Sequence, residues 1–179
     1  MAKRVGPRPE GFPAAQVREI CSVSTCMARD FADWARHWLH NGYWMFDTPD
    51  RIREVARREG LDLAGVRLFF YEAYEREFDE DGLRWIPLHV ERSIPTQVAL
   101  PAVKTPLGFD VVTYSCRTAA ECSPLSCNLL AATMETNEHC LLSTLERAIE
   151  GLEAGRFANS EPGPFRILAV HEVAWAGGA

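Results

Sequence analysis

The sequence predicts an α+β fold, with a mixed or mainly antiparallel sheet of about four strands and helices packed on one face. Helical patterns come first, near residues 28–42 and 48–60, and most of the extended segments follow them. Two of the extended segments are joined by a short turn, as in an antiparallel hairpin. Regular alternation of strands and helices would instead predict a parallel sheet, so the order of the elements favours the α+β class.

Three segments have the residue pattern of a helix. The first has aromatic residues at helical spacing, which predicts an apolar inner face. In the second, Thr48 is suited to cap the first turn, Pro49 to open it, and Gly60 to end the helix. In the third, Ser143 and Glu146 have the spacing of a capping box. The three predicted helices span residues 28–42, 48–60 and 143–155.

The extended segments are rich in aromatic and β-branched residues. The turn residues at 78–83 join the first two of them into a hairpin. Pro87 has no amide hydrogen to donate, so the second strand of that hairpin is expected at an edge of the sheet. Strands are predicted at residues 66–77, 84–90, 109–116 and 165–175, with a shorter one at 97–100.

A chain of 179 residues has the length of one domain. Residues 1–14 contain Pro7, Pro9 and Pro13, a composition that favours irregular or extended chain. We therefore expect a loose N-terminal arm over residues 1–14 and a single α+β domain over residues 15–179.

Composition narrows the classes of function. The formal net charge of −6 argues against nucleic-acid binding, which depends on Lys and Arg neutralising phosphates. The longest apolar runs are much shorter than the ~20 residues of a membrane-spanning helix, so no membrane association is expected. The first residues lack the apolar stretch of a secretory signal. These features predict a cytoplasmic protein with reduced thiols.

Six cysteines then need a role, and four of them form two similar pairs in "CSVSTC" and "CSPLSC". Short spacing between thiolates is typical of structural zinc sites, in which two pairs complete a tetrahedron. The candidate zinc ligands are Cys21, Cys26, Cys122 and Cys127, with Cys116, His139 and Cys140 as alternates. The competing interpretation, which the sequence favours, is that the cysteines are small buried apolar residues.

A reactive thiol is a further interpretation of the same cysteines. Cys26 precedes the first predicted helix, where free amides and the helix dipole favour a thiolate. Cys140 precedes the third predicted helix, and His139 lies next to it in the sequence. No known cysteine-hydrolase motif surrounds either residue. The weak catalytic candidates are Cys26, Cys122, Cys127, His139 and Cys140.

The predicted hairpin turn is strongly acidic. Its carboxylates can attract a basic protein partner, although a solubilising turn has the same composition. Tyr43 and Trp44 follow a glycine after the first predicted helix, where aromatic side chains can line an interface. The candidate partner-binding residues are Glu77, Asp79, Glu80, Asp81, Tyr43 and Trp44.

The sequence therefore favours a small acidic protein-binding module without catalytic activity, resembling an inhibitor or immunity protein by analogy of class alone. In this interpretation any bound zinc ion stabilises the fold, and the partner is a basic protein. The alternative is a cysteine-dependent enzyme or redox protein that uses the segment from Cys116 to Cys140.

Overall fold

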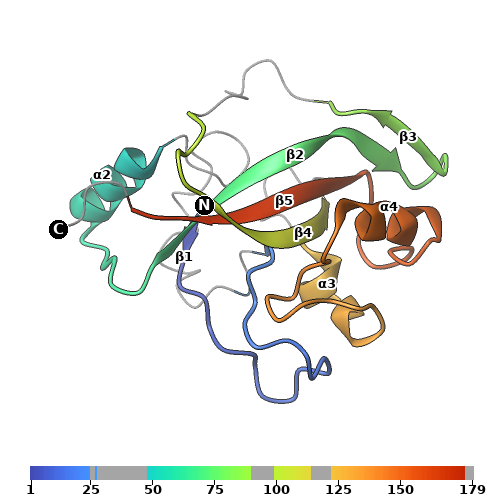
Figure 1. Ribbon diagram of the computed structural model, residues 1–179, viewed down its shortest axis with the longest axis horizontal. Coiled ribbons are helices and arrows are strands. Elements are labelled where there is room, and N and C mark those ends of the chain that lie inside the picture. The colour runs from blue at the N-terminus through green and yellow to red at the C-terminus, as the bar shows by residue number, and fades with distance from the viewer. Residues whose placement is uncertain (25–26, 28–47, 90–98, 114–121, 176–179) are drawn as a thin grey trace.

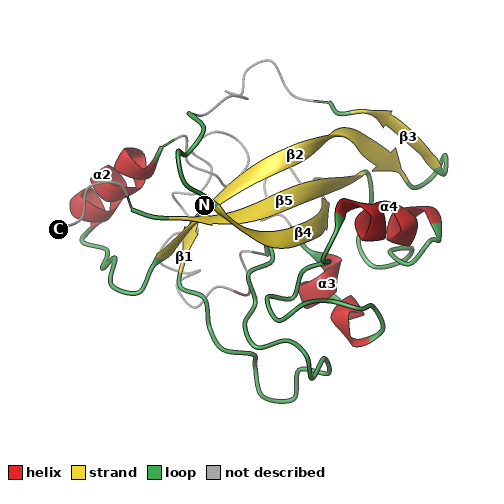
Figure 2. Ribbon diagram, in the orientation of Figure 1, coloured by secondary structure: helices red, strands yellow, loops and turns green. Residues whose placement is uncertain are grey.

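The computed structural model describes residues 1–24, 27, 48–89, 99–113 and 122–175 (Figure 1). Its centre is a five-stranded antiparallel sheet with the strand order β1-β2-β5-β4, and β3 pairs with β2 (Figure 2). The predicted α+β class is confirmed. In chain order the elements are β1 (Ala2–Lys3), α2 (Pro49–Glu59), β2 (Arg67–Asp79), β3 (Arg84–Pro87), β4 (Thr105–Thr113), α3 (Pro124–Cys127), the 3₁₀ helix η3 (Leu130–Ala132), α4 (Leu145–Glu153) and β5 (Phe165–Val173).

The two longer helices pack on the same face of the sheet. Side chains two residues apart on a strand point to the same side, so alternate residues of β5 share a face. Phe165 and Ile167 belong to the buried cluster that contains Leu152 of α4. Val173, on the same face, packs against the cluster that contains Val55 of α2. The prediction of helices on one face is confirmed, with α2 and α4 at opposite ends of the sheet (Figure 1).

Irregular chain covers the other face of the sheet. Phe69 of β2 and Val170 of β5 form a buried cluster with Cys21 and Leu141. Cys21 and Leu141, which cover the two strand residues, lie outside helices and strands, and both are completely buried. The described part of the first cysteine segment therefore belongs to the interior, because it helps to cover this face.

The outer edge of β4 is paired with the segment that carries His139. Phe109 and Leu142 exchange two backbone hydrogen bonds of 2.8 and 2.9 Å. Gly108 permits this approach, because a Cβ atom there would lie 2.7 Å from the carbonyl oxygen of Leu142. Its φ of +142° also lies in a region that side chains disfavour. Glycine at this position therefore places the neighbouring turn against the sheet.

The caps of the helices can be compared with the predictions. Thr48 accepts a hydrogen bond from the Arg51 amide at 3.2 Å, and Gly60 ends α2 with a φ of 68°, as predicted. Helix α4 begins one residue later than predicted. The capping residue is Thr144, and not Ser143, because the Thr144 hydroxyl accepts a hydrogen bond from the Arg147 amide. Both threonine and serine carry the hydroxyl that a cap needs, so the residue type did not distinguish the two positions.

The strands largely follow the predictions. The hairpin is formed by β2 and β3, and β3 ends at Pro87 on the edge of the sheet, as predicted. Strand β4 begins at Thr105, before the predicted start, because a shift in register between Pro106 and Gly108 accommodates the proline. Residues 99–100 form no strand. The predicted helix at 28–42, residues 97–98 and residues 114–116 lie outside the described residues.

The N-terminal residues differ from the predicted loose arm. Ala2 and Lys3 form β1 and pair with β2, and both are buried. Phe12 and Ala14 contribute to the largest buried cluster. Proline-rich chain is extended, and extended chain can pair with a strand or pack into a core. In the described parts of the chain, no helix combines the length and apolar character needed to span a membrane.

Candidate functional site

The two similar cysteine segments meet in space, and serines make the contacts. The hydroxyl of Ser126 lies 2.7 Å from that of Ser22 and 2.9 Å from that of Ser24. The amide of Ser123 donates to the Ser24 hydroxyl at 3.0 Å. Of the cysteines, Cys127 joins this network through a 3.0 Å contact between its Sγ and the Ser24 Oγ. The matching serines therefore make contacts between the described parts of the two segments.

Asp110 anchors this network from β4. Its carboxylate accepts 2.6 Å hydrogen bonds from the Ser123 hydroxyl and the Val23 amide, and it is completely buried. Burial raises the pKa of Asp110 to about 7, although these two hydrogen bonds and the charge of Lys3 act in the opposite direction. Lys3 is itself buried and donates to the carbonyl oxygen of Ser22. These groups tie β1, β4 and both cysteine segments together.

A different set of side chains has the composition of a metal site. Among the described residues, Glu19, Cys21 and His139 form the group whose ligand atoms all lie within 4.8 Å of one another. Cys122, Cys127 and Cys140 are not part of this cluster. The predicted ligands Cys26 and Cys116 lie outside the described residues. Of the predicted metal ligands, the structure therefore brings Cys21 and His139 together.

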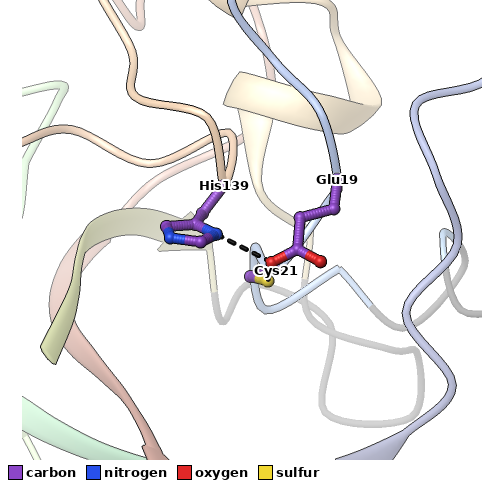
Figure 3. Close-up of side chains that lie close together, drawn as sticks. All are labelled: Glu19, Cys21 and His139. Atoms are coloured by element: carbon purple, nitrogen blue, oxygen red, sulfur yellow. Dashed lines mark hydrogen bonds and ion pairs between the residues drawn. The ribbon is translucent and has the colours of Figure 1, made fainter. Parts of the chain in front are cut away.

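The carboxylate of Glu19 is the centre of the cluster (Figure 3). Its Oε1 lies 2.8 Å from His139 Nδ1 and 3.3 Å from Cys21 Sγ. Its Oε2 accepts a 2.7 Å hydrogen bond from Arg67. The guanidinium of Arg67 also makes two bonds, of 2.8 and 2.6 Å, to Glu172 on β5. Glu19 is therefore held from the sheet side by a charged pair.

Backbone bonds fix the two loops that supply the cluster. The amide of Cys21 donates to the carbonyl oxygen of His139 at 3.0 Å, and the amide of Glu19 donates to that of Glu138 at 3.1 Å. The side chain of Asn137 accepts from the amide of His139 at 3.0 Å and closes the turn. Ligands far apart in the sequence are consequently held in one place by main-chain geometry.

Sequence reasoning missed Glu19 and Arg67. Glu19 and Cys21 are two residues apart, and side chains at this spacing on extended chain point the same way. That spacing is the local signal from which the pair could have been found. No local pattern connects them to Arg67 or to His139, because the fold creates those contacts.

The thiols of Cys21, in the cluster, and of Cys140, which follows His139 in the sequence, are held protonated. Burial, and then the charge of Glu19, raises the pKa of Cys21 to about 12. Burial also raises the pKa of Cys140 to about 12. For Glu19, burial acts to raise the pKa, but hydrogen bonds from Arg67, His139 and Cys21 bring it below its ordinary value. A thiol nucleophile needs a lowered pKa, so this environment does not favour cysteine catalysis.

The geometry around His139 also does not favour cysteine catalysis. In a cysteine hydrolase the histidine lies between the thiol and the acid. Here the acid lies between the other two, since Glu19 Oε1 contacts both His139 and Cys21. A hollow of about 400 Å³ adjoins the cluster, and Pro7, Arg18 and Glu138 contribute to its walls. The cluster is therefore partly open on one side.

A second hollow lies at the predicted acidic turn. It has a volume of about 540 Å³ and is formed by the turn after β2 and the segment 159–164. The turn is stabilised by Asp79, which accepts from the Gly82 amide at 3.2 Å and from Arg84 at 3.1 Å. In the part of the chain that the structure describes, four carboxylates contribute to the walls and no basic side chain does. The four are Asp79, Glu80, Asp81 and Glu161.

The remaining predicted partner-binding residues are not part of this hollow. The side chain of Glu77 is only 5% exposed and forms a 2.8 Å ion pair with Arg166. The expectation that Glu77 contacts a partner is therefore not supported, because its carboxylate is buried and already paired with Arg166 of β5. Tyr43 and Trp44 lie outside the described residues. Glu161 was not predicted, since it reaches the acidic turn through the fold.

Comparisons with known proteins give no family assignment. No protein-family model matches the chain, and no curated protein or solved structure shows significant similarity to it. The chemistry of the two sites is therefore the basis on which a function can be proposed.

Proposed function

We propose that this is a binding protein without catalytic activity, and that the hollow formed by Asp79, Glu80, Asp81 and Glu161 receives basic side chains of a partner protein. The observation that carries the proposal is the charge of the walls: among the described residues, four carboxylates and no cation line a concave surface. A cavity with walls of one sign concentrates its electric field and attracts the opposite charge.

Three of the four carboxylates are available to a partner. Within the described parts of the chain, Glu80, Asp81 and Glu161 form no ion pair, whereas Asp79 is engaged by Arg84. Carboxylates that lack a cation gain the most from an incoming lysine or arginine. The formal net charge of −6 adds a long-range attraction for a basic partner.

Asp79 has a supporting role in this proposal. Hydrogen bonds from the Gly82 backbone and from Arg84 hold its pKa below the usual range. The carboxylate is therefore ionised, and its bonds fix the turn that carries Glu80 and Asp81. A partner would meet a turn of defined shape, which lowers the entropy cost of binding.

The test uses a short capped peptide of alternating lysine and arginine, labelled for fluorescence anisotropy. The triple variant Glu80→Gln, Asp81→Asn, Glu161→Gln removes the available charges and leaves Asp79 in place. We expect its affinity for the peptide to be lower by about tenfold, since three partly exposed charge pairs contribute a few tenths to one kcal/mol each. Affinity of the unmodified protein should also fall as salt rises.

A charge-matched control separates the hollow from net charge. The variant Glu10→Gln, Glu146→Gln, Glu150→Gln removes the same number of charges from exposed positions elsewhere. It should bind the peptide almost as well as the unmodified protein. Equal losses in the two triple variants would mean that only overall charge matters, and would contradict a specific site.

A cytoplasmic location is also part of the proposal. Cys21 and Cys140 are present as thiols, which is in keeping with a reducing compartment.

A further inference from the structure

We propose that Glu19, Cys21 and His139 bind one zinc ion, with a water molecule from the adjoining hollow as the fourth ligand. The site differs from a four-cysteine site in its donors and is independent of the acidic hollow. It is carried by the cluster in Figure 3, in which the three side chains converge from two segments of the chain.

The donor set selects the class of metal. The cluster offers one thiol sulfur, one imidazole nitrogen and one carboxylate oxygen. Calcium and magnesium prefer oxygen ligands throughout, whereas zinc accepts sulfur, nitrogen and oxygen together. Three protein ligands and one open position are typical of zinc sites that keep a water.

The distances suit a tetrahedral ion. Zinc bonds of about 2.0–2.3 Å at tetrahedral angles separate neighbouring ligand atoms by about 3.3–3.7 Å. Cys21 Sγ already lies 3.3 Å from Glu19 Oε1, and His139 Nδ1 lies 2.8 Å from the same oxygen. The histidine and carboxylate therefore need to separate by about half an ångström, while the main-chain bonds between the two loops stay in place.

The surroundings supply an outer shell. Arg67 holds the second oxygen of Glu19 at 2.7 Å, which orients the first oxygen toward the cluster. The charge of Arg67 is balanced by Glu172 through two further bonds. Asn137 fixes the backbone on which His139 is carried. Each of the three proposed ligands is thus positioned by a group or main-chain bond that need not change when the metal binds.

Zinc binding changes the protonation of two ligands. The Nδ1 hydrogen that His139 donates to Glu19 leaves, and Nε2 carries the ring proton in the zinc-bound state, so that zinc can take the lone pair of Nδ1. Zinc also takes an oxygen lone pair of Glu19, and the Cys21 thiol loses its proton to solvent. Binding consequently releases at least one proton, and affinity should rise with pH. No oxidant or reductant takes part, since zinc keeps its charge.

The decisive experiment is X-ray absorption at the zinc edge on the unmodified full chain. The protein is stripped with a chelator under reducing conditions, given one equivalent of zinc and desalted. We expect near-stoichiometric zinc with a single sulfur and otherwise nitrogen or oxygen neighbours. Loss of the zinc on desalting, a shell without sulfur, or a shell with two or more sulfurs would overturn the proposal.

Cobalt binding to variants assigns the sulfur. Cobalt(II) in the unmodified protein should give a thiolate charge-transfer band that Cys21→Ser abolishes and that the matched control Cys122→Ser keeps. His139→Gln should weaken binding by more than the 10–100-fold that loss of an outer-shell partner costs. Persistence of the band in Cys21→Ser would contradict the assignment. If that variant does not fold by circular dichroism, the absorption measurement on the unmodified chain still decides.

Discussion

The two acidic regions of the molecule differ in how their charges are compensated. Asp110 is completely buried and Glu19 is partly buried, and each of their carboxylate oxygens has a hydrogen-bond donor. Glu80, Asp81 and Glu161 line an open hollow and, among the described residues, have no ion-pair partner. The comparison teaches that acidic composition alone does not identify a binding surface. The compensated carboxylates hold the fold together, and the uncompensated ones are available to another molecule.

The regions also differ in how the chain builds them. The inner cluster joins residues from the first 24 positions to β4 and to the turn at 137–142, so it depends on the complete fold. The hollow depends on one hairpin turn and on the segment before β5. Substitutions in the inner region should therefore change stability, and substitutions in the hollow should change binding.

The largest expected effect is on Asp110. Asp110→Ala should lower the free energy of unfolding by about 3–5 kcal/mol, because it leaves the Ser123 hydroxyl and the Val23 amide without a partner and removes a charge near Lys3. Urea unfolding followed by circular dichroism measures the change. A loss below about 1 kcal/mol would show that the inner network does not hold the fold.

The approach of His139 to the sheet depends on Gly108. Gly108→Ala should destabilise the protein by about 2–3 kcal/mol, since the new Cβ would lie 2.7 Å from the Leu142 carbonyl oxygen at a strained φ of +142°. The control is Gly155→Ala, which has a positive φ of +67° but open space around its Cβ. It should cost about 1 kcal/mol. Equal losses in thermal unfolding would mean that the close contact is unimportant.

The pH dependence of stability distinguishes the two kinds of carboxylate. The pKa of Asp110 is raised from 3.8 to about 7 in the folded protein, so the native state holds this proton more tightly. The stability that the raised pKa of Asp110 contributes is fully present below about pH 4 and is lost as the pH rises through 7. Relative to Asp110→Asn, the unmodified protein should lose stability over this range, by at most about 1.4 kcal/mol per pH unit. Parallel urea-unfolding curves for the two proteins would contradict this.

The smallest effect on stability is expected in the hollow. The triple variant Glu80→Gln, Asp81→Asn, Glu161→Gln should unfold within about 0.5 kcal/mol of the unmodified protein, because these side chains have no described ion pair to lose. Thermal unfolding monitored by circular dichroism checks this. A clear loss of stability would show that the hollow also serves the fold, and would remove the contrast between the regions.

The sequence predicted the parts of the fold that have a strong local signal. The cap at Thr48, the stop at Gly60 and the edge position of Pro87 follow from single residues and their neighbours. The burial of residues 1–3 and the contact between residues 19 and 139 have no such signal. They arise when distant segments pack, and no property of the isolated segments determines which ones meet.

The cysteine pattern likewise did not determine which side chains would be in contact. The repeated spacing in residues 21–26 and 122–127 did not predict whether the two segments meet, and it directed attention to the sulfur atoms. The described parts of the two segments do meet. The contacts are made by Ser22, Ser24 and Ser126, and Cys21 points to Glu19 instead. Which side of an irregular segment faces its neighbour depends on its backbone path, which spacing does not determine.

The central claim, that the acidic hollow is the binding site, is tested most directly by nuclear magnetic resonance. The isotope-labelled full chain is titrated with the lysine–arginine peptide, and its counterpart with glutamine at every basic position serves as control. We predict that the basic peptide shifts the amide signals of residues 79–82 and 159–163 and that the control peptide does not. Shifts confined to other surfaces, such as the hollow beside His139, or identical shifts with both peptides, would contradict the account.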